Sequence, residues 1–431
     1  MKKVAFYTLG CKVNQYETQA ISEIFENEGY QVSDFDEVCD IYVINTCSVT
    51  GLSDRKSRQM IRRAKRRNPA AVIAVTGCYA QTAADKVLAI DGVNLVVGTK
   101  GRKEIVSLCE KAAEEKKINA VSDILHTHEF EEDLTITTFE ERTRAYVKAQ
   151  EGCSQFCSYC IIPYARGPVR SRSKKAILDE IKTLVSKGFR EIVLVGIHIA
   201  SYGKDLKDTS LSDIIKEINA IEGLSRIRLS SIEPMTLNEE FINAVSGADK
   251  LCPHFHISLQ SGADETLKRM NRKYNTEQYY SIAKLLEKNF KDCAITTDIM
   301  VGFPGEDDKE FEECMNFVKK MSFADAHIFS YSPRPGTPAA KMKNQVPPEI
   351  KQLRSEKMFE IVKESRKNYL DSYNGRAMEV LFERECENGI YEGKTVNYIH
   401  VKVKSEKDIS GEILKVKIIS NDSEICFGEV M

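Results

Sequence analysis

The chain has 431 residues, of which 42% are hydrophobic and 29% charged, and this balance excludes a chain that is disordered throughout. The length predicts two to four domains. The 62 Lys and Arg residues almost balance 64 Asp and Glu residues, so any nucleic-acid site must be a local basic patch. The longest uncharged run, residues 68–84, contains Asn, Pro and Gly, and the start of the chain lacks the pattern of a signal peptide. We therefore expect a cytoplasmic protein with no membrane span.

The first 118 residues alternate between apolar runs of strand length and helical patterns. The expected strands are 3–9, 41–46, 71–76 and 93–97, and the expected helices lie at about 15–29, 51–67 and 80–90. Nearly continuous apolar strands are typical of a sheet covered on both faces. This alternation predicts a small parallel α/β domain over residues 1–118, followed by a charged linker over 119–142.

A second alternation predicts a larger α/β domain over residues 143–370. Its expected strands are 145–149, 191–197, 226–232, 254–260, 294–302 and 326–331, with helices at about 174–188, 211–222, 237–246, 276–289 and 307–321. Six β/α units fit a partial or full barrel of the TIM type. We expect the proline-rich stretch 333–348 to be extended and a long helix to follow at about 347–371.

The last 60 residues change period. Four short runs read as strands separated by polar turns: 377–383, 398–403, 412–419 and 425–430. They predict a small antiparallel β-barrel over residues 371–431. The expected fold class is therefore α/β, with an additional all-β tail.

Three cysteines at offsets of four and three residues form the strongest motif, and we call Cys153, Cys157 and Cys160 the barrel triad. They follow the first barrel strand, at the end of the barrel where such folds carry their chemistry. Structural zinc usually takes four ligands, and no fourth Cys or His lies close in sequence. Three thiolates can instead hold three irons of a [4Fe–4S] cluster and leave one iron open. The CxxxCxxC spacing resembles the signature of radical S-adenosylmethionine (AdoMet) enzymes; buried or zinc-bound thiols are the less favoured interpretation.

A second set of cysteines follows three different predicted strands, and we call Cys11, Cys47 and Cys78 the sheet triad. Because the carboxyl ends of parallel strands meet at one edge of a sheet, the three thiols could lie close together. The spacing alone leaves open whether they form a second cluster site or are three unrelated thiols. The remaining cysteines show no such pattern, and we expect them to pack in the core: Cys39, Cys109, Cys252, Cys293, Cys314, Cys386 and Cys426.

The order of these parts resembles the radical-AdoMet methylthiotransferase family over essentially the whole chain. The matching segments are QSG at 260–262, DIMVGFPGE at 298–306, FSYSPRPGTPA at 329–339 and GKTVNYIHV at 393–401, the last in a tail similar to the TRAM RNA-binding module. The segment TLGCKVNQYET at 8–18, together with the segments NTCSVT and RKSRQMIRRA, most resembles the sequences of one branch of the family. That branch acts on N6-threonylcarbamoyladenosine beside the tRNA anticodon. Two other branches remain alternatives: one acts on isopentenyladenosine in tRNA, the other on an aspartate of a ribosomal protein.

The resemblance implies cofactors, partners and site residues. It implies AdoMet and two [4Fe–4S] clusters, one on each triad, with AdoMet at the open iron of the barrel cluster and sulfur delivered at the other. It implies a tRNA anticodon stem-loop as partner, a one-electron reductant such as flavodoxin or ferredoxin, and a sulfur source. The implied cofactor contacts are Tyr159, Gly196, Gln260, Ser261, Asp298 and Gly302. A non-catalytic iron–sulfur or zinc RNA-binding protein and an electron-transfer protein are the competing interpretations.

Basic residues cluster in two places. Residues 55–67 carry eight basic and no acidic side chains, and helical spacing places Arg55, Arg58, Arg62 and Arg66 on one face, which suits phosphate contacts. A solvated surface helix is the alternative. A second group follows the barrel triad: Arg166, Arg170, Arg172, Lys174 and Lys175. The tail 371–431 has eight basic and 12 acidic residues, so RNA contact there would depend on one face that carries Lys394, Asn397 and Tyr398.

Overall fold

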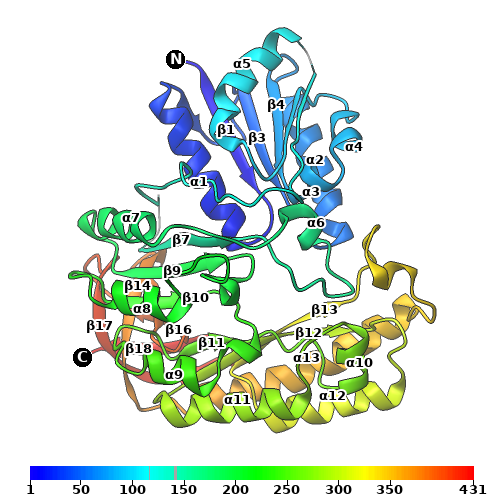
Figure 1. Ribbon diagram of the computed structural model, residues 1–431. Coiled ribbons are helices and arrows are strands. Elements are labelled where there is room, and N and C mark those ends of the chain that lie inside the picture. The colour runs from blue at the N-terminus through cyan, green and yellow to red at the C-terminus, as the bar shows by residue number, and fades with distance from the viewer. Residues whose placement is uncertain (116, 140–142) are drawn as a thin grey trace.

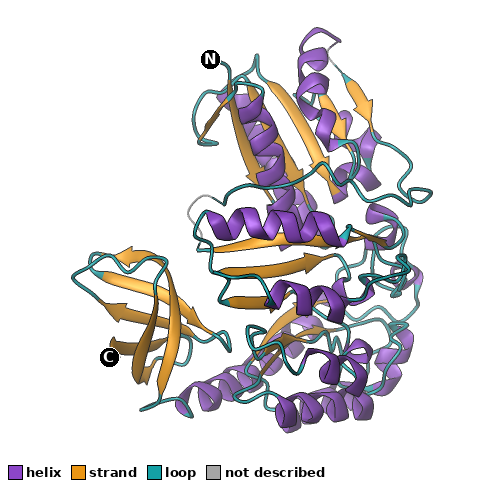
Figure 2. Ribbon diagram, turned by 60° about the vertical axis from the view of Figure 1, so that its left-hand side comes forward, coloured by secondary structure: helices purple, strands orange, loops and turns teal. Residues whose placement is uncertain are grey.

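The computed structural model describes residues 1–115, 117–139 and 143–431; the end of the expected linker, residues 140–142, lies outside this part. Figure 1 shows an α/β layer at the N-terminus, a larger strand-and-helix body below it and a small barrel at the C-terminus. Figure 2 shows the small barrel standing to one side of the body, reached through the last long helix. None of the helices in the described residues is both long and apolar enough to cross a membrane.

The N-terminal layer is a six-stranded parallel sheet of order β2-β1-β3-β4-β5-β6. Its strands are β1 Lys3–Thr8, β2 Gln31–Ser33, β3 Ile41–Thr46, β4 Val72–Gly77, β5 Leu95–Val97 and β6 Ile118–Ala120. Its helices are α1 Lys12–Asn27, α2 Gly51–Arg67, α3 Cys78–Thr82, α4 Ala84–Leu88 and α5 Ile105–Glu115. The parallel sheet confirms the predicted fold class.

Two details of this layer differ from the expectation. The three-residue edge strands β2 and β6 were not predicted, because three residues give no measurable periodicity. The expected helix at 80–90 is two short helices, separated at Ala83, whose φ of −146° is not helical. The Thr82 hydroxyl bonds back to the carbonyl of Cys78, which gives the backbone a local alternative to continuing the helix.

The central body is a partial barrel whose parallel strands follow the sequence order. Its strands are β7 Arg144–Glu151, β9 Glu191–Gly196, β10 Arg226–Leu229, β11 His254–His256, β12 Ala294–Val301 and β13 Asp325–Ser330. Single bridges from Ile227 to Leu251 and from Ile232 to Ile257 join the sheet of β7, β9 and β10 to that of β11, β12 and β13. Among the described residues β13 does not pair with β7, so the barrel is open between its first and last strands.

Helices cover the outside of this partial barrel (Figure 1). They are α7 Lys174–Ser186, α8 Leu211–Asn219, α9 Glu239–Val245, α10 Asp264–Arg269, α11 Thr276–Asn289, α12 Asp308–Met321 and α13 Pro348–Asp371. The short helix α6 Ile162–Arg166 instead lies against α3, between the barrel and the N-terminal layer. The edge of β7 carries a short antiparallel partner, β8 Arg170–Ser171. Apolar side chains of α1, α7 and α13 share one buried cluster with the barrel strands, so the N-terminal layer and the barrel have a continuous core.

The tail is a closed five-stranded barrel of order β14-β15-β16-β18-β17. Its strands are β14 Ala377–Glu387, β15 Ile390–Thr395, β16 His400–Lys404, β17 Ile413–Asn421 and β18 Cys426–Val430. The prediction missed β15, which is rich in Gly and charged residues. Asn388-Gly389 between β14 and β15 is the hairpin signal that could have found it, and Gly389 has a φ of +73°. One pair, β16 with β18, is parallel, so the barrel is not wholly antiparallel.

Candidate functional site

The barrel triad lies in the loop that leaves β7. Gly152 begins this loop with a φ of +76°, and a Cβ there would lie 1.8 Å from the carbonyl oxygen of Pro168, so only glycine fits. The amide of Cys153 donates to the carbonyl of Gly167 at 3.0 Å, and that of Cys160 to the carbonyl of Cys157 at 2.9 Å. Burial raises the pKa of Cys153 to about 11 and that of Cys160 to about 12, and both thiols interact with Cys157. The loop thus holds the three thiols together, as predicted.

Arg272 is a partner of the barrel triad that the sequence analysis missed. Its Nη1 lies 3.3 Å from Cys157 Sγ, and its guanidinium stacks over the ring of Tyr274 at 4.9 Å. Glu233 lies 3.8 Å from the same guanidinium. A guanidinium that donates to a sulfur atom stabilises the thiolate, the form that binds a metal cluster. Arg272 follows α10, more than a hundred residues from Cys157, and no local spacing connects the two.

The sheet triad is assembled from the ends of three neighbouring strands. Thr46 pairs with Gly77 across β3 and β4, and Thr8 pairs with Asn45 across β1 and β3, so the three strands end level. Cys11 caps α1, Cys47 follows β3 directly and Cys78 begins α3. Each of the Cys47 and Cys78 thiols interacts electrostatically with the other thiols of the triad, and burial raises the pKa of Cys78 to about 12. The structure therefore brings the three predicted cysteines together.

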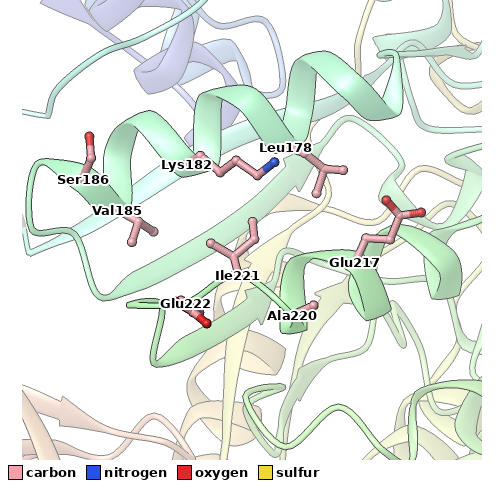
Figure 3. A pocket seen from close by; sticks show the side chains of 8 residues that line it. All are labelled: Leu178, Lys182, Val185, Ser186, Glu217, Ala220, Ile221 and Glu222. Carbon is pink, nitrogen blue, oxygen red and sulfur yellow. The ribbon is translucent and has the colours of Figure 1, made fainter.

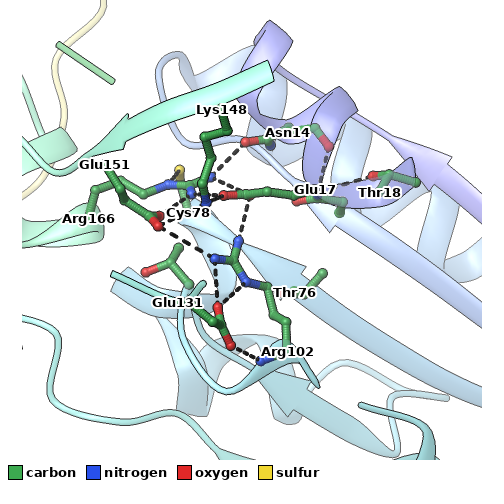
Figure 4. A network of polar contacts seen from close by, with 12 residues as sticks. Asn14, Glu17, Thr18, Thr76, Cys78, Arg102, Glu131, Lys148, Glu151 and Arg166 are labelled. Atoms are coloured by element: carbon green, nitrogen blue, oxygen red, sulfur yellow. Dashed lines mark hydrogen bonds and ion pairs between the residues drawn. The ribbon is translucent and has the colours of Figure 1, made fainter. Parts of the chain in front are cut away.

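A buried set of charges joins Cys78 of the sheet triad to Glu151, the last residue of β7 (Figure 4). Arg166, from α6 just after the barrel triad, donates from Nε to Cys78 Sγ at 3.3 Å. Its Nη1 bonds Glu17 of α1, and also Glu151, the last residue of β7, at 2.7 Å. Lys148 lies 2.9 Å from both carboxylates. Direct hydrogen bonds and ion pairs thus connect a thiol of the sheet triad to β7, the strand that precedes the barrel triad.

These charges are balanced within the network. Arg102, which is fully buried, bonds Glu17 at 2.6 Å and Glu131 at 3.1 Å (Figure 4). The surrounding cations hold the pKa of Glu17 well below its usual range and lower that of Glu151 to about 2, against the opposing effect of burial. Burial of paired charges is tolerated only where the pairing is this complete.

Neither triad is arranged for a single metal ion. Tetrahedral thiolate ligands of one zinc ion, each about 2.3 Å from the metal, lie about 4 Å apart. Within the described residues, the ligand atoms of no three cysteines converge to within 4.8 Å of one another. A polynuclear cluster holds its thiolates on different metal atoms, so its ligands need not converge on one point. Three thiols, a basic donor on one of them and close-approach glycines therefore fit an iron–sulfur cluster at each triad.

The predicted cofactor contacts divide into two groups. Gly196 at the end of β9 lies beside Gln150 of β7, and Gln260 has a left-handed φ of +68° between β11 and β12. Tyr159 of the triad loop lies edge-on to Phe303 at 6.4 Å, and Asp298 is a half-buried residue of β12. These four residues remain predicted AdoMet contacts.

The other two predicted contacts have close neighbours within the chain. Ser261 is 1% exposed, and its hydroxyl accepts from the amide of Ala263 at the start of α10. Gly302 has a φ of +71°, and a Cβ there would lie 2.3 Å from Lys351 Cγ of α13. Ser261 and Gly302 remain predicted AdoMet contacts, with the Ser261 hydroxyl already hydrogen-bonded within the chain.

Asp298 is held between two histidines on the neighbouring strands. His256 of β11 lies 3.1 Å from one carboxylate oxygen, and His327 of β13 lies 3.3 Å from the other. Within the described residues this is the one group of His, Cys, Asp and Glu side chains whose ligand atoms converge to within 4.8 Å. The pairing raises the pKa of His327. Two imidazoles and one carboxylate could hold a divalent ion, but they already satisfy one another as ion pairs.

The basic cluster predicted over residues 55–67 lies on the exposed face of α2. Arg55, Arg62 and Arg66 of α2 are exposed, while Met60, Ile61 and Ala64 on the opposite face are buried. Arg58 is half-buried and donates to the hydroxyl of Tyr79 at 3.3 Å. These four arginines remain predicted RNA contacts.

The prediction of a second basic cluster after the barrel triad is wrong for its three arginines. Arg166, Arg170 and Arg172 are buried, with exposed fractions of 0%, 2% and 0%. Arg172 pairs with Glu180 at 2.8 Å, and the other two approach Glu151. The missing information was the position of the acidic partners, which lie on other elements. Lys174 and Lys175 are at the surface and pair with Glu217 and Asp179.

The tail residues also lie differently from the expectation. Asn397 is 1% exposed and donates to the hydroxyls of Tyr369 and Tyr373. Tyr398 stacks face to face on His254 of β11, with ring centroids 4.5 Å apart. In this structure Asn397 has no surface to offer to RNA, and the face of Tyr398 that stacks on His254 cannot also stack on a base. Lys394 is half-buried beside Tyr398.

One surface hollow lies away from both triads. Figure 3 shows it between α7 and the end of α8, where Leu178, Val185 and Ile221 line its floor. It carries no cysteine or histidine and is on the outer, helical side of the barrel. The chemistry of the chain is at the triads.

Comparison with known proteins agrees with this geometry. Residues 147–318 match the family model described as the radical SAM superfamily, and residues 3–98 match an uncharacterised protein family designated UPF0004. The chain is 44% identical over 425 residues to the Bacillus subtilis threonylcarbamoyladenosine tRNA methylthiotransferase MtaB, covering 97% of this chain and 94% of that protein. It is 39% identical to the Aquifex aeolicus protein of the same name, covering 96% and 100%. The chain belongs to the radical-SAM methylthiotransferase family.

Two further comparisons concern the substrate and the fold. The chain is 35% identical to a tRNA-2-methylthio-N(6)-dimethylallyladenosine synthase of Clostridium botulinum, covering 98% of this chain and 95% of that protein. The structure of the radical AdoMet methyltransferase TsrM from Kitasatospora setae has a TM-score of 0.59 at 15% identity, covering 79% of this chain and 74% of that one, and shares the fold. Membership of the family makes this protein an enzyme that uses AdoMet and a [4Fe–4S] cluster.

Proposed function

We propose that this enzyme transfers a methylthio group to C2 of N6-threonylcarbamoyladenosine next to the anticodon of tRNA. The observation that carries the proposal is the pair of three-cysteine sites, joined across one interface by Arg166. A single triad suffices to cleave AdoMet, whereas a sulfur insertion needs a second place from which sulfur is supplied. The similarity to two proteins named for threonylcarbamoyladenosine supports this base over isopentenyladenosine.

Each triad has a separate role in this proposal. Cys153, Cys157 and Cys160 would hold the cluster that binds AdoMet, and Cys11, Cys47 and Cys78 a second [4Fe–4S] cluster. When bound, the barrel cluster and AdoMet supply radical chemistry for an unreactive C–H bond, which no side chain can provide. The chain itself orients the parts: Arg166 and Arg272 each donate to one ligating sulfur, and the closed network around Glu17 keeps water from the interface.

Substrate binding assigns roles to the remaining predicted residues. The exposed arginines of α2 would contact the phosphates of the anticodon stem, next to the sheet triad on the same layer. The adenine is in a single-stranded loop, so it leaves its stack at small energetic expense. A flavodoxin- or ferredoxin-like reductant and a sulfur source complete the proposed set of partners.

The test is an anaerobic assay on the reconstituted full-length protein. It would be incubated with dithionite, AdoMet and tRNA that carries N6-threonylcarbamoyladenosine, and nucleosides would be analysed by mass spectrometry. We expect the 2-methylthio product. Formation of 5′-deoxyadenosine without a tRNA product would refute the substrate assignment. Product from isopentenyladenosine tRNA alone, or from the ribosomal protein alone, would assign the chain to another branch.

A further inference from the structure

Lys12 lies next to the sheet triad. It follows Cys11 directly and is the first residue of α1. Its ammonium interacts electrostatically with Arg144 at the start of β7 and with His327 on β13. These residues belong to the first and last strands of the barrel. It also interacts with Tyr398 and Lys394 of the tail.

The groups that Lys12 meets form a concentrated set of cations. The ring of Tyr398 has Lys394 Nζ at 4.0 Å, the Arg228 guanidinium at 4.8 Å and the Arg144 guanidinium at 5.7 Å from its centroid. Thus all three main parts of the chain contribute: Lys12 from the N-terminal layer, the two arginines from the barrel, and Lys394 with Tyr398 from the tail.

Only part of this positive charge is neutralised. Arg228 pairs with Glu191 at 3.0 Å, and Arg144 lies 3.4 Å from Glu383. Among residues 1–115, 117–139 and 143–431, no hydrogen bond or ion pair is made by the ammonium groups of Lys12 and Lys394 or by the hydroxyl of Tyr398. All three side chains are half-buried, where an unpaired ammonium is costly and an anion is attracted strongly. The surrounding cations lower the pKa of Tyr398 to about 7, against the effect of burial, so this place stabilises negative charge. The two ammonium groups are donors that a carboxylate accepts.

The position relative to the sheet triad indicates which carboxylate this is. In adenine, C2 and C6 are both bonded to N1, so a substituent on N6 lies on the same ring edge as the C2 hydrogen. A base whose C2 faces the Cys11 side of the interface therefore carries its N6 substituent toward Lys12. A threonylcarbamoyl group ends in a carboxylate, whereas a dimethylallyl group has no charge.

We propose that Lys12, Lys394 and Tyr398 form an anion subsite that binds the carboxylate of the N6 substituent and selects threonylcarbamoyladenosine over bases with neutral substituents. This proposal rests on the proposed function and names the residues that determine its specificity. Arg144 and Arg228 hold the ring of Tyr398 in place and belong to the wall of the subsite.

The experiment measures each protein variant with each of three RNA substrates. Anticodon stem-loop RNAs would carry threonylcarbamoyladenosine, its neutral carboxamide analogue, or isopentenyladenosine. Their Kd values for the reconstituted full-length protein would be measured by fluorescence anisotropy, and methylthio product by mass spectrometry. The proteins are the unmodified enzyme, Lys12→Gln, Lys394→Gln, and Lys404→Gln as a matched control at an exposed position of the tail.

We expect the unmodified enzyme and Lys404→Gln to bind the acid RNA about ten- to a hundredfold more tightly than the carboxamide RNA, as for a charge-assisted hydrogen bond. Lys12→Gln should lose most of this preference while its Kd for the carboxamide RNA stays unchanged, and Lys394→Gln should lose part of it. Production of 5′-deoxyadenosine by Lys12→Gln would show that the barrel triad is intact.

Three outcomes would overturn the proposal. If Lys12→Gln weakens binding of the acid and the carboxamide RNA equally, Lys12 contacts the RNA backbone or supports the fold. If the preference for the acid survives in both lysine variants, the carboxylate is bound elsewhere, and the proposed function still stands. If the unmodified enzyme modifies only the isopentenyladenosine RNA, the proposed function itself fails.

Discussion

The two cysteine triads differ in how the chain brings their sulfur atoms together. The barrel triad lies within one loop, so the spacing of its three residues already defines a ligand set. The sheet triad is collected from the ends of β1, β3 and β4 and requires the correct strand order and register. Each also receives a guanidinium, Arg272 for the first and Arg166 for the second, from a distant part of the chain. Local spacing can thus specify ligands, but not the groups that tune them.

The largest expected effect is that replacing a cysteine of one triad abolishes different products than replacing a cysteine of the other. Cys157→Ala should abolish both 5′-deoxyadenosine and the methylthio product, because AdoMet loses its cluster. Cys78→Ala should abolish only the methylthio product, and the iron content should fall from about eight to about four atoms per chain. Product analysis and iron and sulfide counts check this, with Cys109→Ala in the core as control. Loss of 5′-deoxyadenosine in Cys78→Ala would show that the triads are not independent.

The two arginines should differ in their structural importance. Arg166→Gln leaves Glu17 and Glu151 short of a buried cation and should lower the free energy of unfolding by about 3–5 kcal/mol. Arg272→Gln loses hydrogen bonds to Cys157, Tyr274 and Ser258, but its one carboxylate, Glu233, is as far away as 3.8 Å, so the loss should be smaller, about 1–3 kcal/mol. Urea unfolding of both variants measures the difference. Equal losses would mean that the network around Glu17 adds nothing to the interface.

The buried network also predicts acid sensitivity. The pKa of Glu151 is about 2 in the folded chain, against an ordinary value of 4.5, and that of Glu17 is also well below 4.5. Carboxylates with lowered folded pKa values stabilise the fold above pH 4.5, and this contribution is lost as pH falls from 4.5 toward 2. Urea midpoints between pH 7 and pH 3 should therefore decrease. The decrease should be shallower in Glu151→Gln; an unchanged slope would contradict the assignment.

A moderate effect is expected at the basic face of α2. Arg62→Gln and Arg66→Gln should each weaken tRNA binding several-fold at low salt and reduce the slope of log Kd against log salt by about one. Arg67, which bonds Asp36 at 2.9 Å, provides the comparison, because part of its charge is already neutralised. Filter binding at several salt concentrations measures the slopes. If Arg67→Gln has the largest effect, the predicted face is not the RNA surface.

The smallest effect concerns the predicted cofactor contacts. Ser261→Ala should leave the KM for AdoMet within about twofold, because the hydroxyl points to the amide of Ala263. Its free energy of unfolding should fall by about 1 kcal/mol, because one buried hydrogen bond is lost. AdoMet cleavage rates at several AdoMet concentrations test this. A large increase in KM would show that the Ser261 hydroxyl contacts AdoMet.

Sequence alone determined the succession of a parallel α/β layer, a β/α barrel and a β tail, because hydrophobic periodicity is a local property. It also determined both sets of candidate ligands, since each cysteine is marked by a strand end or by its spacing. Burial and pairing came only from the tertiary structure. Arg166, Arg170 and Arg172 read as a basic surface until Glu17, Glu151 and Glu180 were placed beside them.

The contacts of Lys12 with Arg144, Lys394 and Tyr398 likewise join three distant parts of the chain. The physical reason is that the burial and pairing of a charged side chain depend on the groups packed around it, and tertiary packing, not sequence adjacency, decides which groups these are.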